Sequence, residues 1–110
     1  MKYNYRAIVK SVHDGDTFTV DIDLGFGVWF KDQNIRLYGI NAPEVKGEFR
    51  SLGFTSRDRL SELTINKEII LETIKDKKEK YGRWLGIVLV DGKNVNDLLV
   101  EEGFAKRYEC

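Results

Sequence analysis

The chain contains little cysteine, proline or histidine, and each scarcity narrows what the protein can be. Among its 110 residues there are one Cys, one Pro and one His. The single cysteine, Cys110, cannot form an internal disulfide, so cysteine usage does not indicate the redox compartment. One proline and no low-complexity run argue against long disordered segments. The single histidine, His13, has no neighbours at the spacing that Zn²⁺ ligands require.

Long apolar runs and an excess of one charge are also missing. No apolar stretch approaches the ~20 residues of a transmembrane helix, so no membrane association is expected. Residues 1–6 lack the apolar core of a signal peptide, so export is not predicted and a cytoplasmic location is expected. Lys and Arg total 18, Asp and Glu total 18, and the formal net charge is +0. The chain is therefore not a globally basic nucleic-acid-binding protein.

The first part of the sequence predicts strands. Apolar and polar residues alternate from Thr17 to Leu24, as in a half-buried strand. Residues 5–12 predict an earlier strand, which the turn sequence Asp14-Gly15 connects to it. Glycines follow Leu24, and we expect a further hairpin and strand at 28–30 and 35–40.

The second part predicts two helices among further strands. Apolar or small residues recur every three or four positions between Phe49 and Leu63, which predicts a helix over residues 51–63. Gly53 weakens that helix by ~1 kcal/mol relative to alanine. The later elements are strands at 67–74 and 84–90, the turn Asp91-Gly92, a helix from N-cap Asn94 to Gly103, and an extended piece at 104–108.

These elements predict a mainly β (α+β) fold. Many short strands in a small chain favour a barrel, and no strand–helix–strand alternation suggests a parallel sheet. We expect a five-stranded β-barrel of the oligonucleotide/oligosaccharide-binding (OB) type with about two packed helices. One domain over residues 1–110 is expected, since this length is enough for one small core.

Two short segments carry oxygen ligands. Asp14-Gly15-Asp16 places two carboxylates at a tight turn, where they could face a hard cation such as Ca²⁺. The alternative is an ordinary hairpin turn, for which Asp-Gly is a common sequence. Asn41-Ala42-Pro43-Glu44 adds an amide oxygen for the cation and a carboxylate, which would either lie next to the cation's ligands or act as a general base within reach of a water. Its alternative is routine loop chemistry.

Two arginines add candidate phosphate ligands. Arg36 alternates with apolar neighbours and should face away from the core, and Arg83 stands at the start of a strand. Each alone is consistent with an ordinary surface arginine. Together with a divalent cation they would stabilise the charge that builds up during phosphodiester hydrolysis. Residues 75–83 carry five basic and two acidic residues, and form either a solvated hairpin loop or a basic loop that meets phosphates.

The combined order of these pieces resembles the staphylococcal nuclease-like (thermonuclease) family. The matching segments are Asp14-Gly15-Asp16-Thr17, Ile35 to Glu44, Lys80-Tyr81-Gly82-Arg83 and Gly92 to Asn96. The similarity extends from about Arg6 to Tyr108. It implies an OB-type barrel and Ca²⁺-dependent hydrolysis of DNA and/or RNA. In such nucleases a water attacks phosphorus and the 5′-oxygen leaves, which gives 3′-phosphate ends.

The resemblance also implies roles for single residues. Arg36 and Arg83 match the phosphate-binding arginines, and Glu44 matches the glutamate proposed as general base. Lys80 and Tyr81 match residues that contact a substrate phosphate.

The implied metal ligands are Asp16, through its carboxylate, and Ala42, through its main-chain carbonyl. Asn41 stands where the best-known members have a metal-binding aspartate. It can donate one carbonyl oxygen but removes one negative charge. Weaker or altered binding of Ca²⁺ is therefore expected, with Mg²⁺ or Mn²⁺ as alternative ions.

A second departure concerns the end of the sequence at Cys110, because the best-known members continue with another C-terminal helix. We expect a second copy of the chain to cover the apolar surface left in its place, as a homodimer. The leading interpretation is a metal-dependent phosphodiesterase acting on nucleic acid. The alternative is a weak or inactive nuclease-like domain that binds single-stranded nucleic acid or a protein partner.

Overall fold

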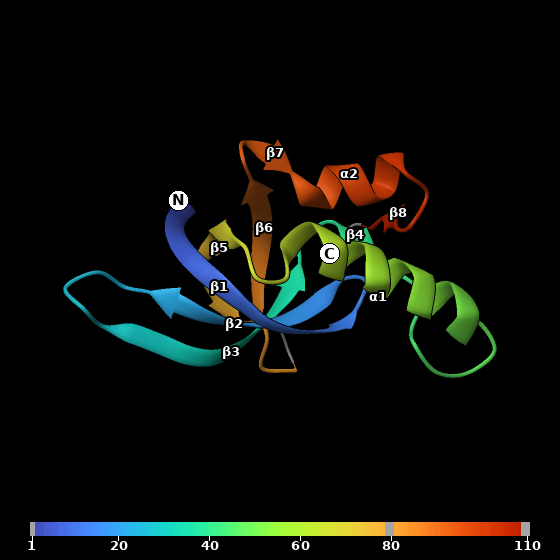
Figure 1. The fold of residues 1–110 in the computed structure, drawn as a ribbon, viewed down its shortest axis with the longest axis horizontal. Helices are drawn as coiled ribbons and strands as arrows, with labels where there is room; N and C mark the ends of the chain where they lie inside the picture. The colour runs from blue at the N-terminus through green and yellow to red at the C-terminus, as the bar shows by residue number, and fades with distance from the viewer. Residues whose placement is uncertain (1, 79–80, 109–110) are drawn as a thin grey trace.

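The computed structural model describes residues 2–78 and 81–108, which form strands and two helices (Figure 1). The elements are, in order, β1 (Lys2–Asp14), β2 (Thr17–Asp23), β3 (Trp29–Leu37), β4 (Ile40–Asn41), α1 (Arg50–Thr64), β5 (Glu68–Lys78), β6 (Trp84–Val90), β7 (Lys93–Asn94), α2 (Val95–Glu101) and β8 (Lys106–Arg107).

Five strands close into a barrel, as the sequence predicts. The order β3-β2-β1-β5-β6 is antiparallel throughout, and a short parallel pairing of β3 with β6 closes the ring. That pairing aligns Ile35–Leu37 with Trp84–Gly86. The lack of strand–helix–strand alternation in the sequence had given no reason to expect a parallel sheet, and this short parallel pair was not predicted. The closure brings residues far apart in the sequence to neighbouring strands.

The core lies inside the barrel and beneath the two helices. Its largest fully buried side chains come from most of the long elements: Phe18, Ile35, Leu37, Ile40, Leu60, Ile69, Leu71 and Leu99. Arg36 lies between two of them on β3 and faces outward, half-buried, as the alternation predicts. Arg36 is thus held on the outer face of the barrel, with the apolar core on the opposite side of β3.

Helix α1 begins and ends within one residue of the predicted range, and its glycine has a packing role. A Cβ on Gly53 would lie 1.9 Å from the Glu44 carbonyl oxygen. A Cβ on Gly15 would lie 2.6 Å from Cβ of Ser56 in the same helix. Only glycine allows α1 to approach both the β1–β2 turn and the segment that carries Glu44 so closely.

Helix α2 has the ends that the sequence predicts. The Asn94 side chain accepts a hydrogen bond from the Asp97 amide (3.0 Å), which caps the first turn. Gly103 follows the helix with φ +83°. Among the described residues, neither helix is long and apolar enough to cross a membrane.

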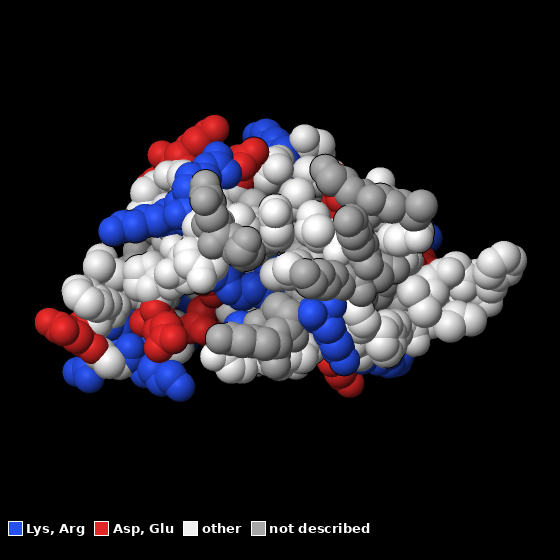
Figure 2. Space-filling model, turned by 180° about the vertical axis from the view of Figure 1, so that it is seen from behind, with Lys and Arg blue, Asp and Glu red and all other residues white. Residues whose placement is uncertain are grey.

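The β2–β3 hairpin differs from its prediction. We expected a short strand at 28–30 and another at 35–40, but β3 is one strand, Trp29–Leu37. In the turn before it, the Leu24 amide donates to the Val28 carbonyl, the Val28 amide donates to the Gly25 carbonyl, and Phe26 has positive φ. This uncharged tip projects from the barrel in Figure 1 and forms the white end in Figure 2. Phe26 is 105% exposed there.

The basic segment at 75–83 is also only partly a loop. Strand β5 continues through Lys78, well past the predicted end at residue 74. Residues 79 and 80 lie outside the described residues. Beyond them, Tyr81 to Arg83 lead directly into β6.

Candidate active site

Asp16 is the centre of the candidate site. It lies in the turn between β1 and β2 and is 6% exposed. Its Oδ2 accepts a hydrogen bond from the Ala42 amide (2.8 Å), and its Oδ1 accepts one from the Thr17 hydroxyl (2.8 Å). Its main-chain carbonyl accepts from the Leu37 amide (2.8 Å). The structure therefore brings Asp16 against the segment of Asn41 and Ala42, although 25 residues or more separate them in sequence.

Arg36 extends from β3 toward the same carboxylate. Its Nη1 lies 3.5 Å from Asp16 Oδ2 and donates to the Leu37 carbonyl (2.9 Å). Its Nη2 donates to Asn41 Oδ1 (3.2 Å). The Arg36 side chain is only 14% exposed. A guanidinium held on two sides is oriented before any ligand arrives, which lowers the entropic cost of a phosphate contact.

The three residues predicted to hold the metal are linked through the Ala42 amide and the Arg36 guanidinium, and their predicted donor atoms are all oxygens. The Asp16 carboxylate, the Asn41 amide and the Ala42 carbonyl are hard donors of the type that Ca²⁺ takes. Their charge is low, since Asn41 contributes none. In the described part of the chain, no group of three His, Cys, Asp or Glu residues is placed to hold a metal ion. The donor type thus fits a hard cation, while the donor charge predicts weak binding.

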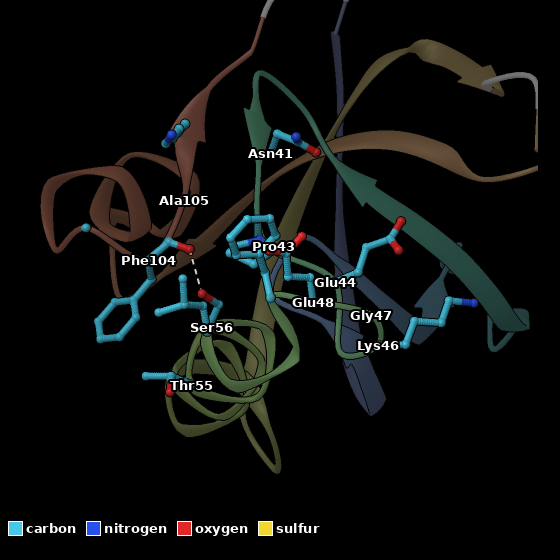
Figure 3. A pocket seen from close by; sticks show the side chains of 15 residues that line it. Asn41, Pro43, Glu44, Lys46, Gly47, Glu48, Thr55, Ser56, Phe104 and Ala105 are labelled. Atoms are coloured by element: carbon cyan, nitrogen blue, oxygen red, sulfur yellow. Dashed lines mark hydrogen bonds between the residues drawn. The ribbon is translucent and has the colours of Figure 1, made fainter.

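Glu44 sits in the loop between β4 and α1, on an exposed position. The Val45 amide next to it donates to Asp14 Oδ1 (3.2 Å), and α1 packs against the Glu44 main chain at Gly53. In Figure 3 the Glu44 carboxylate lies on the β3 side of the loop, away from Ser56. The main chain is thus fixed while the carboxylate stays open to solvent, as a base that activates water requires.

An open cavity of about 830 Å³ adjoins this loop (Figure 3). It lies between residues 41–49, the first turns of α1 and residues 103–106. The Ser56 hydroxyl donates to the Phe104 carbonyl (2.7 Å) across its floor. Asn41 and Glu44 belong to its lining, so the two predicted site residues border open space on this side.

Arg83 comes from a later segment of the chain. It immediately precedes β6, whose parallel pairing sets Leu85 beside Arg36. Its guanidinium carbon lies 5.5 Å from the centre of the Tyr81 ring. Tyr81 is 70% exposed. Barrel closure therefore sets Arg36 on β3 beside the start of β6, which Arg83 precedes. Lys80, the other predicted substrate contact, lies outside the described residues.

One residue that positions the site was not recognised as such from the sequence. Asn96 of α2 is 2% exposed and donates from Nδ2 to the Tyr38 carbonyl (2.9 Å) and the Gly86 carbonyl (3.1 Å). Its Oδ1 accepts from the Val88 amide (3.0 Å). Asn96 thereby ties the end of β3 to β6 just past the two arginine-bearing positions. The sequence signal for this role is the position of Asn96, a polar residue two positions after the N-cap Asn94 and next to the apolar residues of the helix.

Comparisons with known proteins agree with this architecture. Residues 34–110 match the family model described as "Staphylococcal nuclease homologue". The chain is 33% identical over 101 residues to "Thermonuclease" of Staphylococcus hyicus, which covers 89% of this chain and 56% of the relative.

Two further relatives are endonucleases by name. "Endonuclease YncB" of Bacillus subtilis (strain 168) is 34% identical over 97 residues, covering 84% of this chain and 43% of the relative. An "Uncharacterized endonuclease" of Escherichia coli O157:H7 is 37% identical over 102 residues, covering 92% of this chain and 60% of the relative. The chain spans about half the length of the curated relatives it matches. With its closed barrel and the family match over most of its length, the chain belongs to the staphylococcal nuclease family.

Proposed function

We propose that this chain hydrolyses phosphodiester bonds of DNA and/or RNA. The observation that supports the proposal is the closure of the barrel by β3 and β6, which sets Arg36 of β3 beside Leu85, two residues after Arg83. Asp16 and Asn41 both contact Arg36, and the main chain of Glu44, three residues after Asn41, is packed against α1 at Gly53. Two arginines and a nearby carboxylate are the groups that a phosphate-binding site with a general base requires.

The proposed reaction uses the chain's own groups as follows. Glu44 takes a proton from a water whose oxygen forms a bond to phosphorus. The bond from phosphorus to the 5′-oxygen breaks, the 5′-oxygen takes a proton from solvent, and a 3′-phosphate end remains. Arg36 and Arg83 stabilise the negative charge that grows on the non-bridging oxygens. Lys80 and Tyr81 are proposed to contact a phosphate of the bound strand.

A hard cation, Ca²⁺ with Mg²⁺ or Mn²⁺ as alternatives, would be held by Asp16, Asn41 and the main-chain carbonyl of Ala42. When bound, such an ion supplies Lewis-acid stabilisation of the phosphoryl charge. The Arg36 guanidinium 3.5 Å from Asp16 already offsets part of the carboxylate charge. Together with the neutral Asn41, this supports a low affinity for the ion.

A second function is supported by the contacts of Asn41. Its amide oxygen accepts from Arg36, so one proposed metal donor is already engaged inside the protein. In that arrangement the domain would bind a nucleic-acid strand and cut it slowly or not at all. The same residues would carry the binding, through phosphate contacts to the two arginines.

The test is cleavage of fluorescently labelled single-stranded DNA and RNA with Ca²⁺ and with EDTA. The proposal expects cutting in Ca²⁺, loss of cutting in EDTA, and products whose 3′ ends become extendable only after phosphatase treatment. Binding without cutting in Ca²⁺, Mg²⁺ and Mn²⁺ would support the second function. Neither binding nor cutting would overturn both.

A further inference from the structure

The turn between β2 and β3 exposes apolar side chains that the candidate active site does not use. From Leu24 to Phe30 the sequence is Leu-Gly-Phe-Gly-Val-Trp-Phe and carries no charge. Phe26 at its apex is 105% exposed, and the other four large side chains are between 41% and 52% exposed. We call residues 24–30 the hairpin tip. A contiguous exposed apolar patch of this kind typically marks an interaction surface.

The backbone at the apex makes Phe26 an unexpected residue for this turn. Its φ is +56°, and the glycines on either side also have positive φ. Glycine or asparagine adopts this conformation with little strain, whereas a bulky side chain rarely does. Because Phe26 is fully exposed, it gains no packing inside the protein that would offset the strain or the contact with water. A contact outside the chain would supply what the fold does not.

The tip is convex and carries apolar side chains on both faces of the hairpin. Phe30 pairs with the buried Ile22 and so continues the core side of the hairpin, whereas Trp29 pairs with Asp23 and faces the opposite side. The tip projects beyond the barrel in Figure 1 and forms the white end of the molecule in Figure 2. A protein partner would cover one of these faces, whereas a fluid apolar medium closes around a projection from all sides.

The charged side chains at the base of the hairpin are compensated within the protein. Arg6 Nη2 lies 3.1 Å from Asp23 Oδ2, and Lys10 Nζ lies 3.5 Å from Asp21 Oδ2. Lys31-Asp32 follows the tip with one charge of each sign. The base thus has balanced charges behind an uncharged tip. This arrangement suits the electrically neutral headgroups of a zwitterionic bilayer better than an anionic surface or a nucleic acid.

The tip lies at the end of β2 away from the candidate active site. Strand β2 begins at Thr17, next to Asp16, and ends at Asp23, about 20 Å farther on at ~3.3 Å per residue. In Figure 1 the β2–β3 turn lies at the left end of the long axis and the loop before α1 at the right end. A contact at the tip therefore leaves the candidate active site open to solvent.

We propose that the hairpin tip docks into the interfacial layer of a zwitterionic phospholipid bilayer and holds the chain at the membrane surface. Phe26 and its apolar neighbours enter the boundary between headgroups and acyl chains, and Trp29 lies at the level of the headgroups. The expectation of no membrane association considered only spanning helices, and a peripheral contact of this kind needs none. The inference is independent of the proposed function.

The test is co-sedimentation of the protein with sucrose-loaded phosphatidylcholine vesicles. One myristoyl chain gives a membrane affinity of about 10⁴ M⁻¹, so a tip of a few side chains requires lipid at about millimolar concentration. Phe26→Asn should weaken vesicle binding about tenfold or more, because the apolar contact is lost while asparagine keeps the left-handed turn. Phe49→Asn is the matched control, since it removes an exposed phenylalanine just before α1, and it should bind like the wild type.

A second measurement reports from the tip itself. In Trp84→Phe the only remaining tryptophan is Trp29, and its emission should move to shorter wavelength when vesicles are added. An unchanged emission, equal binding by wild type and Phe26→Asn, or no binding by the wild type would overturn the proposal.

Two other outcomes would assign the tip or the binding to a different cause. Binding confined to anionic vesicles and abolished by salt would overturn the proposal, because the contact would then depend on charge. Self-association without lipid that Phe26→Asn abolishes, together with no vesicle binding, would assign the tip to a second copy of the chain and overturn the membrane contact.

Discussion

Gly53→Ala should destabilise the protein although alanine is the better helix former. The added Cβ would lie 1.9 Å from the Glu44 carbonyl oxygen, 2.3 Å from its carbon and 2.8 Å from the Val45 nitrogen. All three are main-chain atoms, so no side-chain rotation relieves the clash. The loop must move by about 1 Å or more before ordinary contact distances return.

The magnitude follows from two opposing terms. Alanine gains ~1 kcal/mol of helix propensity over glycine. Overpacking costs about 1–3 kcal/mol, and rigid main-chain partners place it near the upper end. We therefore expect a net loss of about 2 kcal/mol in the free energy of unfolding, which is roughly 10 °C in Tm. Because Glu44 moves with the loop, cleavage should fall about 100-fold.

Urea unfolding measures the stability change, with a lower midpoint and an unchanged m-value expected. Ser51→Ala is the matched control, because it raises helix propensity at an exposed position of the same helix. It should keep both stability and cleavage. A Gly53→Ala protein that is more stable than wild type and cleaves normally would refute the close packing of α1 on the Glu44 loop.

Three further changes test other parts of the account. Asn41→Asp should tighten Ca²⁺ binding about tenfold in calorimetry, since ligand charge raises affinity; unchanged affinity would remove position 41 from the ligands. Arg83→Lys should lower turnover about 100-fold, since lysine cannot form a bidentate phosphate pair, and normal turnover would argue against a forked contact. The Asp32 amide, with a further contribution from Lys10 and against the opposing effect of burial, holds the pKa of Asp21 below its ordinary value. That carboxylate stabilises the fold above the unfolded pKa of about 3.9 and loses this effect as the pH falls through its folded pKa. Asp21→Asn should flatten the stability loss below about pH 4 in unfolding titrations, and an unaltered acid profile would contradict the assignment.

Local patterns predicted the elements well where one physical signal dominated. The alternation along residues 17–24 predicted β2, and Asn94 and Gly103 predicted the ends of α2. The β2–β3 turn was harder, because the exposed Phe26 adopts positive φ, where an aromatic residue gives no turn signal. The prediction ended β5 too early, at residue 74, because the last residues of this strand are charged and show no alternation of apolar and polar residues.

The site could be predicted only as separate segments. Asp16, Arg36 and Asn41 stand in recognisable motifs, but their mutual contacts depend on the pairing of β2 with β3 and on the turn that follows β3. Gly53 looked like a defect in a helix because its partner is main chain from a distant loop. The Thr19 side chain on β2 contacts His13 on β1 and Asn34 on β3 (2.8 Å each), and these contacts depend on strand pairing that no local pattern predicts.

The most direct measurement is single-turnover cleavage of labelled single-stranded DNA in Ca²⁺ by the wild type and by Glu44→Gln, with urea unfolding of both. The exposed position of Glu44 makes the substitution compatible with the fold. The account predicts equal stability and a rate lower by about 10²–10⁴-fold in the variant, the contribution of a positioned general base. Equal cleavage rates would contradict the central claim that Glu44 activates the attacking water at this site.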